Sequence, residues 1–346
     1  MTSLEIGSRL VGPGHSCFVI AEAGVNHNGD ISLAKQLIDA AADVGADAIK
    51  FQTFKAERLA CPKADKAEYQ IRETGAGESQ VEMLRKLELS PEAHLNLLAH
   101  ARSRSIEFLS TPFDEQSADF LEQLGVVLFK VSSGDLTNHP FLFHLATKGR
   151  PLILSTGMAT LSEVETAIAS LPQVPLALLQ CVSNYPANPA DSNLRAMRTM
   201  EKRFGVPVGY SDHTLGNEVS LAAVSLGACI IEKHLTLDRT LPGPDHRASA
   251  SPDEFAALVR GIRIVETALG DGVKVPAPDE KPIAKLARKS LAAACDIAAG
   301  TILSTSVIAA LRPGTGLPPS LRDRVVGKKA RESIPAGTLL SMEMFE

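Results

Sequence analysis

Several side chains of this sequence carry charge or hydroxyl groups at the ends of apolar segments, where packing alone gives them no role. Two of them are lysines, Lys50 and Lys130, and two are glutamates, Glu22 and Glu232. Hydroxyl side chains occupy the same kind of position: Ser110, Thr111, Ser132, Ser133, Ser155, Thr156, Ser183 and Ser211. Two ammonium groups among such hydroxyls suit a phosphate or a phosphorylated carboxylate. The pattern therefore predicts an anion-binding pocket.

Two histidines, His213 and His234, follow two neighbouring apolar segments. Two imidazole nitrogens with open coordination positions suit Mn²⁺, or a similar divalent cation such as Mg²⁺ or Co²⁺. Such a cation would polarise an aldehyde, Glu22 could move a proton or orient water, and Tyr185 could hydrogen-bond a sugar hydroxyl. We expect phosphate release joined to carbon–carbon bond formation.

Each of these residues also has an ordinary structural explanation. A single lysine at a strand end is usually solvated or ion-paired, a single histidine is usually a hydrogen-bonded core residue, and serines often cap helices. Burying Lys50, Lys130, Glu22 and Glu232 together costs free energy unless they face ligands or one another. Because these side chains would converge on one pocket, a functional site is the favoured interpretation. An alternative hypothesis is that the chain is a Schiff-base aldolase that uses Lys130 or Lys50 as its nucleophile.

The elements that must position these residues are eight apolar segments separated by amphipathic helices. The segments begin at Cys17, Asp47, Ile106, Val126, Pro151, Leu176, Val206 and Ala228. Continuous apolar strands between helices indicate a parallel sheet that is buried on both faces. Eight such units in about 270 residues predict a (β/α)₈ TIM barrel, whose active site lies at the carboxyl ends of the strands. An open doubly wound sheet is the alternative, although no G-x-G-x-x-G motif follows the first segment.

The first helix illustrates the local signals. Asp30 is a candidate N-cap, and Gly45 supplies a left-handed C-terminal turn. One face of the expected helix is apolar and consists of Leu33, Ala34, Leu37, Ile38 and Ala41.

The composition changes near residue 271. We expect a TIM-barrel catalytic domain over residues 1–271, a semi-extended proline-rich linker over 272–284 and a small domain over 285–346. The small domain contains an internal repeat, because DIAAGTILSTSVI from Asp296 resembles SIPAGTLLSMEMF from Ser333. Two copies of one motif predict a compact unit with pseudo-twofold symmetry.

Composition and charge exclude several classes of protein. The 346 residues carry a formal net charge of −5, and a nucleic-acid-binding protein usually has a basic face. No segment approaches the roughly 18 to 20 continuous apolar residues of a membrane helix. The beginning of the sequence lacks an apolar signal core, and the five cysteines form no C-x-x-C pair. We therefore expect a cytoplasmic protein with reduced thiols that binds neither nucleic acid nor membranes.

At these residues the chain resembles the sialic acid synthase family over nearly its full length. The motifs that carry the resemblance are AEAGVNHNGD, GADAIKFQTFKA, FLSTPFD, FKVSSGDLTNHP, LSTGMAT, GYSDHTLG, LGACIIEKHLTLD, PGPDHRAS and RPGTG. The C-terminal segment resembles the SAF domain, also called antifreeze-like. The resemblance implies an enzyme that condenses phosphoenolpyruvate with an N-acetylated mannosamine-type sugar and water, giving a nine-carbon 2-keto acid and phosphate by C–O cleavage.

The resemblance also implies roles for single residues. Phosphoenolpyruvate would be held by Lys50, Thr111, Lys130, Ser133, Ser155, Ser183 and Ser211. The divalent cation would be held by His213 and His234, Glu22 would handle the attacking water or the tetrahedral intermediate, and Glu232 would lie beside the cation. The acceptor sugar would contact Gln52, Asp135, Tyr185 and Asp245.

The family forms a domain-swapped homodimer in which the small domain caps the partner's barrel. The resemblance implies that Arg312 would reach the N-acetyl group of the sugar from the other subunit. The alternative is that Arg312 opens a turn and stays solvated, as surface arginines usually do. A binding role for the antifreeze-like domain, toward ice or a partner, is disfavoured by its charged segment RPGTGLPPSLRDRVVGKKARE.

Two features concern the acceptor. Asp135 stands where bacterial N-acetylneuraminate synthases typically have Glu, although animal enzymes also have Asp. The segment from Tyr69 to Ser90 and the motif PGPDHRAS look closer to legionaminate-type synthases. We therefore expect 2,4-diacetamido-2,4,6-trideoxymannose as the acceptor, with N-acetylmannosamine as the alternative.

Overall fold

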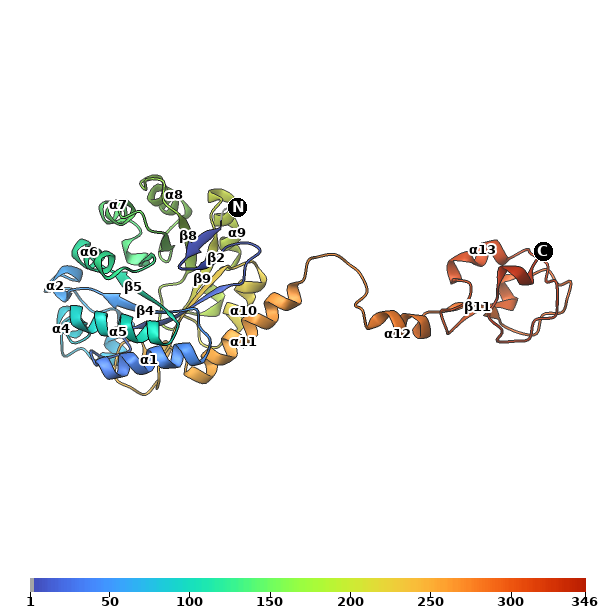
Figure 1. Ribbon diagram of the computed structural model, residues 1–346, viewed down its shortest axis with the longest axis horizontal. Coiled ribbons are helices and arrows are strands. Elements are labelled where there is room, and N and C mark those ends of the chain that lie inside the picture. Colours follow the sequence, from blue (N-terminus) through green and yellow to red (C-terminus); the bar gives the residue numbers. More distant parts are fainter. Residues whose placement is uncertain (1–2) are drawn as a thin grey trace. The chain divides into compact units, whose positions relative to one another are not determined.

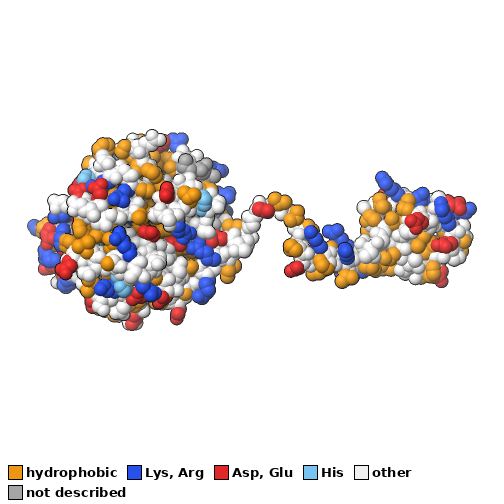
Figure 2. Space-filling view, viewed as in Figure 1, with side chains coloured by type: hydrophobic (Ala, Val, Ile, Leu, Met, Phe, Trp, Pro, Cys, Tyr) orange, Lys and Arg blue, Asp and Glu red, His pale blue; other side chains and the backbone are white. Residues whose placement is uncertain are grey.

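The computed structural model describes residues 3–346 and divides the chain into two compact units, one ending at Gly270 and one beginning at Asp271. The division lies one residue from the domain end expected from the change in composition. Within the described residues, every helix is too short or too polar to span a lipid bilayer. On the face that Figure 2 shows, acidic and basic side chains are interspersed rather than gathered into one basic surface.

Eight parallel strands form a nearly closed ring in the N-terminal unit. They are β3 (Phe18–Gly24), β4 (Ala48–Thr53), β5 (Glu107–Pro112), β6 (Phe129–Val131), β7 (Leu152–Ser155), β8 (Leu176–Cys181), β9 (Val208–Asp212) and β10 (Ile230–His234). Their order is β5-β4-β3-β10-β9-β8-β7-β6, and β5 adjoins β6. Because β5 and β6, the two ends of this order, also lie side by side, the sheet closes into a barrel. The predicted TIM-barrel fold is confirmed, and the open-sheet alternative is wrong.

Helices surround the strands on the outside of the ring (Figure 1). The main ones are α1 (Ile31–Asp43), α5 (Pro91–Ser103), α6 (Glu115–Leu124), α7 (His139–Thr147), α8 (Leu161–Ala169), α9 (Arg195–Phe204), α10 (Glu218–Ser225) and α11 (Pro252–Leu269). Helix α1 begins as predicted, because the Asp30 carboxylate accepts from the backbone N–H of Ser32 at 2.7 Å. Val44 is its C-cap, and Gly45 follows with a left-handed φ of 78°.

The inner side of the barrel changes from apolar to polar along each strand. In β3 the inward positions are Phe18, Ile20 and Glu22, so two apolar side chains precede a carboxylate. The apolar end is closed by a hairpin of β1 (Leu4–Ile6) and β2 (Arg9–Val11), which the sequence did not predict. Leu4, Ile6 and Val11 join the inner cluster. This end is solid core, so a ligand can enter only at the carboxyl ends of the strands.

An insertion between β4 and α5 contains three short helices. They are α2 (Ala56–Leu59), α3 (Glu68–Thr74) and α4 (Gln80–Arg85). Helix α4 begins at a capping box, in which Ser79 and Glu82 bond to each other's backbone N–H groups. The helices hold this long connection in a defined shape beside the carboxyl ends of the strands.

The C-terminal unit has its own core and the predicted pseudo-symmetry. It contains α12 (Glu280–Ala287), β11 (Ser290–Ala293), β12 (Ile308–Leu311) and α13 (Arg322–Val325). Ile297 and Ile334, equivalent positions of the two repeats, exchange backbone hydrogen bonds of 2.9 and 2.8 Å. Gly300 donates to Ala330 and Gly337 donates to Ala293, both at 2.8 Å, so each repeat makes the same contact with the other.

The linker prediction needs a correction. The segment 272–284 was expected to be semi-extended throughout, but α12 begins at Glu280 and continues to Ala287. Pro282 does not prevent this, because it lies in the first turn of the helix, where no backbone N–H is needed.

Candidate active site

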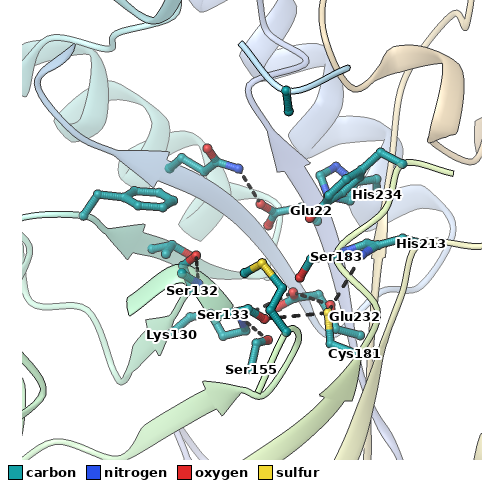
Figure 3. Close-up of a pocket in the computed structure, with 18 of the residues that line it drawn as sticks. Glu22, Lys130, Ser132, Ser133, Ser155, Cys181, Ser183, His213, Glu232 and His234 are labelled. Atoms are coloured by element: carbon teal, nitrogen blue, oxygen red, sulfur yellow. Dashed lines mark hydrogen bonds and ion pairs between the residues drawn. The ribbon is translucent and has the colours of Figure 1, made fainter. Parts of the chain in front are cut away.

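One cavity of about 410 Å³ opens at the carboxyl ends of the barrel strands (Figure 3). Thirteen of the predicted site residues line it: Glu22, Lys50, Gln52, Thr111, Lys130, Ser133, Ser155, Ser183, Tyr185, Ser211, His213, Glu232 and His234. Most of them lie on the strands themselves, and the others follow directly on loops. The predicted lysines, carboxylates and histidines therefore share one pocket.

The deepest part of the pocket is a cluster of two lysines and two glutamates. Lys50 Nζ lies 2.6 Å from Glu22 Oε2 and 3.8 Å from Glu232 Oε2. Lys130 Nζ lies 3.6 Å from Glu232 Oε1. All four side chains are buried, and their formal charges cancel. The cluster can accept an anion because both ammonium groups already face the cavity.

Hydroxyl groups form hydrogen bonds with both lysines and with Glu232. Lys50 Nζ donates to Thr111 Oγ1 at 2.9 Å, and Lys130 Nζ donates to Ser155 Oγ at 2.7 Å. Ser211 Oγ donates to Glu232 Oε1 at 2.9 Å. These bonds fix the ammonium groups and leave the hydroxyl oxygens along the wall of the pocket.

Gly157 lets two further serines approach each other. Its backbone N–H donates to Ser133 Oγ at 3.0 Å. A Cβ at this position would lie 2.3 Å from Ser183 Oγ and 2.8 Å from Ser133 Oγ. Only glycine leaves room for both hydroxyls, so this residue shapes the anion-binding wall.

The surroundings of the two glutamates give them different pKa values. Burial raises the pKa of Glu22 to about 7, against the opposing effect of Lys50. Burial would also raise the pKa of Glu232, but Lys130 and Lys50 together lower it to about 2. Lys50 stays protonated because Glu22 and Glu232 outweigh its burial and raise its pKa. Glu232 is therefore a fixed anion, and Glu22 can exchange a proton near neutral pH.

His213 and His234 lie on one side of the pocket, and Lys130 and Ser155 lie on the other (Figure 3). The two imidazole rings have centroids 5.5 Å apart. His213 Nδ1 donates to the Val182 carbonyl at 2.6 Å, which leaves its Nε2 as the nitrogen available to a ligand. Burial lowers the pKa of His234 well below its usual value, and its Nδ1 is buried without a hydrogen-bond partner in the described chain.

These observations fit a divalent cation held by one nitrogen of each ring. Within residues 3–346 no group of three or more His, Cys, Asp or Glu side chains is arranged to hold a metal. A cation at the histidine pair would therefore complete its coordination with water or substrate oxygens.

Three predicted residues do not line this pocket. Asp135 ends a short 3₁₀ turn, Ser133–Asp135, where it is half-buried beside Asn138. Asp245 is buried, and its burial raises its pKa to about 6. Arg312 belongs to the C-terminal unit, where its side chain is exposed and, within residues 3–346, has no ion-pair partner.

The pocket also has lining residues that the sequence did not predict. They are Ala67, Tyr69, Gln70, Gln80, Phe113, Gly134, Met158 and Cys181. Ser132, one of the strand-end hydroxyls named from the sequence, lines the pocket as well. Cys181 follows the strand-end rule, because it is the last residue of β8. The others come from turns and from the insertion, where no periodic pattern indicates which side chains face the barrel.

Comparisons with known proteins agree with this geometry. Residues 37–274 match the NeuB family, and residues 288–346 match the SAF domain. The chain is 50% identical to the N,N'-diacetyllegionaminic acid synthase of Legionella pneumophila over 347 residues, 98% of each chain. It is 46% identical to the protein of the same name from Campylobacter jejuni, over 93% of this chain and 98% of that one.

A solved structure is similar along most of the chain. It is the N-acetylneuraminic acid (sialic acid) synthetase from Leptospira borgpetersenii in complex with citrate, with 38% identity and a TM-score of 0.72. The match covers 82% of this chain and 95% of that one.

Proposed function

The chain belongs to the NeuB family, the sialic acid synthase family expected from its motifs, and on that premise we propose its reaction. It condenses phosphoenolpyruvate with 2,4-diacetamido-2,4,6-trideoxymannose and water, and it releases a nine-carbon legionaminate-type acid and phosphate. The observation that carries the proposal is the single cavity that joins Lys50 and Lys130 to His213 and His234.

Phosphoenolpyruvate binds at the lysine cluster. Its phosphate and carboxylate oxygens accept from Lys50, Lys130 and the hydroxyls of the wall, namely Thr111, Ser133, Ser155, Ser183 and Ser211. Glu232 forms ion pairs with both lysines and so favours their protonated forms before the substrate arrives. The added negative charge of the substrate favours the protonated form of Glu22, so substrate binding and the protonation of Glu22 are coupled.

The chemistry needs one water and breaks one C–O bond. Carbon C3 of phosphoenolpyruvate bonds to the aldehyde carbon of the sugar, whose oxygen takes up a proton. Water adds to C2, and the tetrahedral intermediate loses phosphate as the C2–O bond breaks and a keto group forms. Glu22 is placed to accept the proton from water, because its pKa lies near neutrality.

His213 and His234 would hold a divalent cation, most suitably Mn²⁺, and the bound cation would polarise the aldehyde of the sugar. The hydrogen bond from His213 to the Val182 carbonyl orients the ring before the cation binds.

The acceptor sugar lies outward from the lysine cluster, beside Gln52 and Tyr185. Tyr185 packs on His213 with ring centroids 4.1 Å apart and on His234 at 5.5 Å, so its ring is held beside the histidine pair. Asp135 and Asp245 lie outside the cavity lining and act on the acceptor only if a loop shifts when it binds. Two similar proteins are named N,N'-diacetyllegionaminic acid synthase, which favours the diacetamido sugar over N-acetylmannosamine.

The C-terminal unit acts on the pocket of a partner subunit in a domain-swapped homodimer. Arg312 is its contribution to the acceptor site, because an exposed arginine without an ion-pair partner is free to bind a carbonyl oxygen. The residues from Asp271 to Asp279, which precede α12, supply the reach for such an exchange.

Side-by-side kinetics test the proposal. We expect phosphate release from phosphoenolpyruvate with the diacetamido sugar, and a lower kcat/KM with N-acetylmannosamine. ¹⁸O in the bridging position should leave with phosphate, which is the signature of C–O cleavage. Retention of ¹⁸O in the keto acid would mean P–O cleavage and would contradict the proposed mechanism. Borohydride trapping of a lysine adduct with a keto acid, without any need for metal, would instead support the Schiff-base aldolase.

A further inference from the structure

One wall of the active-site cavity is made by the insertion between β4 and α5 and has no role in the chemistry described above. Its lining residues are Ala67, Tyr69, Gln70 and Gln80, from α3, from the residue before it and from the start of α4. None of these side chains is charged. The wall therefore differs from the lysine cluster and suits a neutral, hydrogen-bonding part of a ligand.

The polar groups of this wall form one connected row. Gln70 Oε1 accepts from the backbone N–H of Ala67 at 3.0 Å and from Gln80 Nε2 at 3.5 Å. Gln70 Nε2 donates to the Tyr69 hydroxyl at 3.4 Å. The first bond fixes Gln70 at the start of α3, whereas the two longer bonds are weak and can be exchanged for bonds to a ligand. Gln80 Oε1 accepts no hydrogen bond from the described residues.

The row is attached to the reactive side of the pocket through aromatic contacts. Tyr69 packs against Tyr185 with ring centroids 5.0 Å apart, and Tyr185 packs against His213 at 4.1 Å. Arg72 Nη2 also donates to the Tyr185 carbonyl at 3.1 Å, which ties α3 to this loop. A sugar whose aldehyde lies near the histidine pair therefore has the glutamine row within the same cavity.

Two apolar side chains, Phe113 and Met158, line the cavity as well. Met158 is 75% exposed and has a left-handed φ of 64°, an unfavourable conformation for a residue with a side chain. An exposed apolar side chain held in such a conformation at a pocket suits contact with an apolar group of a ligand.

We propose that Gln70 and Gln80 bind the second acetamido group of the acceptor, and that Met158 and Phe113 contact its C6 methyl group. The inference rests on the proposed function and names the part of the pocket that selects the diacetamido sugar. A primary carboxamide matches an acetamido group at two points, since its NH₂ donates to the acetamido carbonyl and its oxygen accepts from the acetamido N–H. A sugar hydroxyl also donates and accepts, but through a single oxygen atom, whereas the acetamido group carries its donor and its acceptor on separate atoms that match the two ends of a carboxamide.

The test compares two acceptors across variants of the wall. Gln80→Leu removes both hydrogen-bonding groups, and Gln70→Glu keeps the oxygen that bonds to Ala67 while removing the donor. For each variant we expect kcat/KM with the diacetamido sugar to fall about 5- to 20-fold, the effect of one or two hydrogen bonds. The KM for phosphoenolpyruvate and the kcat/KM with N-acetylmannosamine should change less than about twofold.

Two further variants separate the subsite from general damage. Gln36→Leu, on the exposed side of α1, is the matched control and should change neither acceptor. Met158→Gly relieves the left-handed conformation and removes the apolar contact, so the preference for the 6-deoxy sugar should fall several-fold while thermal stability is retained.

Several outcomes would overturn the proposal. Equal losses with both acceptors, or no loss with either, would show that the wall does not select the second acetamido group. A wild-type protein that uses N-acetylmannosamine but not the diacetamido sugar would reject the subsite and leave the family reaction intact. Absence of phosphate release with any amino sugar would reject the reaction and the subsite together.

Discussion

At the scale of single residues, Glu22 is the carboxylate of the lysine cluster whose charge can change near neutral pH. Its carboxyl has a pKa raised to about 7 by burial and must be ionised to accept a proton from water. We therefore predict that kcat/KM for phosphoenolpyruvate rises with pH through about 7, measured with the divalent cation saturating at each pH. A flat or falling profile between pH 6 and 8 would contradict this role.

A variant of Gln52 shows whether this rise of kcat/KM with pH comes from Glu22. Gln52 Nε2 donates to Glu22 Oε1 at 3.3 Å and so favours the ionised carboxylate. Gln52→Leu removes this donor, so the pKa of Glu22 should increase and the rise of kcat/KM should move to higher pH. A rise that stays at the same pH would show that it does not come from Glu22.

The two histidines allow a test that does not depend on turnover. Either His213→Ala or His234→Ala removes half of the protein nitrogen ligands, so we expect Mn²⁺ affinity to fall at least about tenfold, measured by electron paramagnetic resonance. Metal-dependent activity should be lost as well. His144→Gln is the control, because His144 on α7 pairs with Asp119 on α6 and neither residue lines the cavity. Near-normal Mn²⁺ binding in both alanine variants would eliminate the assignment.

The sequence predicted these residues because they stand at strand ends. Glu22, Lys50, Lys130 and Glu232 each follow an apolar run on a strand, and parallel strands of a barrel bring their carboxyl ends together. Asp135 and Asp245 were also assigned to the site, but they lie on loops, whose course no periodic pattern determines. Gln70 and Gln80, on short helices of the insertion, and Met158, in a turn, could not be foreseen either, because these segments are too short to show a period.

At the scale of elements, the hairpin of β1 and β2 closes the apolar end of the barrel. Ile6 is fully buried in the inner cluster, whereas Leu10 in the same hairpin is 51% exposed. We predict that Ile6→Ala lowers the free energy of unfolding of this unit by about 2 to 4 kcal/mol. Leu10→Ala should change it by less than about 0.5 kcal/mol.

Intrinsic fluorescence can follow this transition selectively. The chain has no tryptophan, and its three tyrosines, Tyr69, Tyr185 and Tyr210, all lie in the N-terminal unit. Urea unfolding monitored by tyrosine emission therefore reports on the barrel alone. Equal effects of the two substitutions would mean that the hairpin is not part of the core.

The same scale shows what local patterns can and cannot predict. The eight strands were predictable because each is a continuous apolar run next to a helix signal. The hairpin strands have only three residues each, and α2 to α4 have four to seven, too few for a period to emerge. The start of α12 within the expected linker was missed because prolines disfavour helix interiors but not the first turn.

At the scale of the whole molecule, complementation between two inactive variants tests whether Arg312 acts across a dimer. Arg312→Ala damages the acceptor site, and His213→Ala damages the metal site. If the C-terminal unit serves the partner's barrel, a mixed dimer combines an intact pocket with an intact Arg312, and random pairing restores about a quarter of the wild-type sites. If Arg312 serves its own chain, every pocket keeps one defect and co-expression restores nothing.

The assay uses an acceptor concentration at which Arg312→Ala alone is nearly inactive. The control is Arg331→Ala, which changes another exposed arginine of the C-terminal unit and should leave activity unchanged without any partner. Recovery of activity would therefore assign Arg312 to the neighbouring subunit's sugar site, because no arrangement within one chain can produce it.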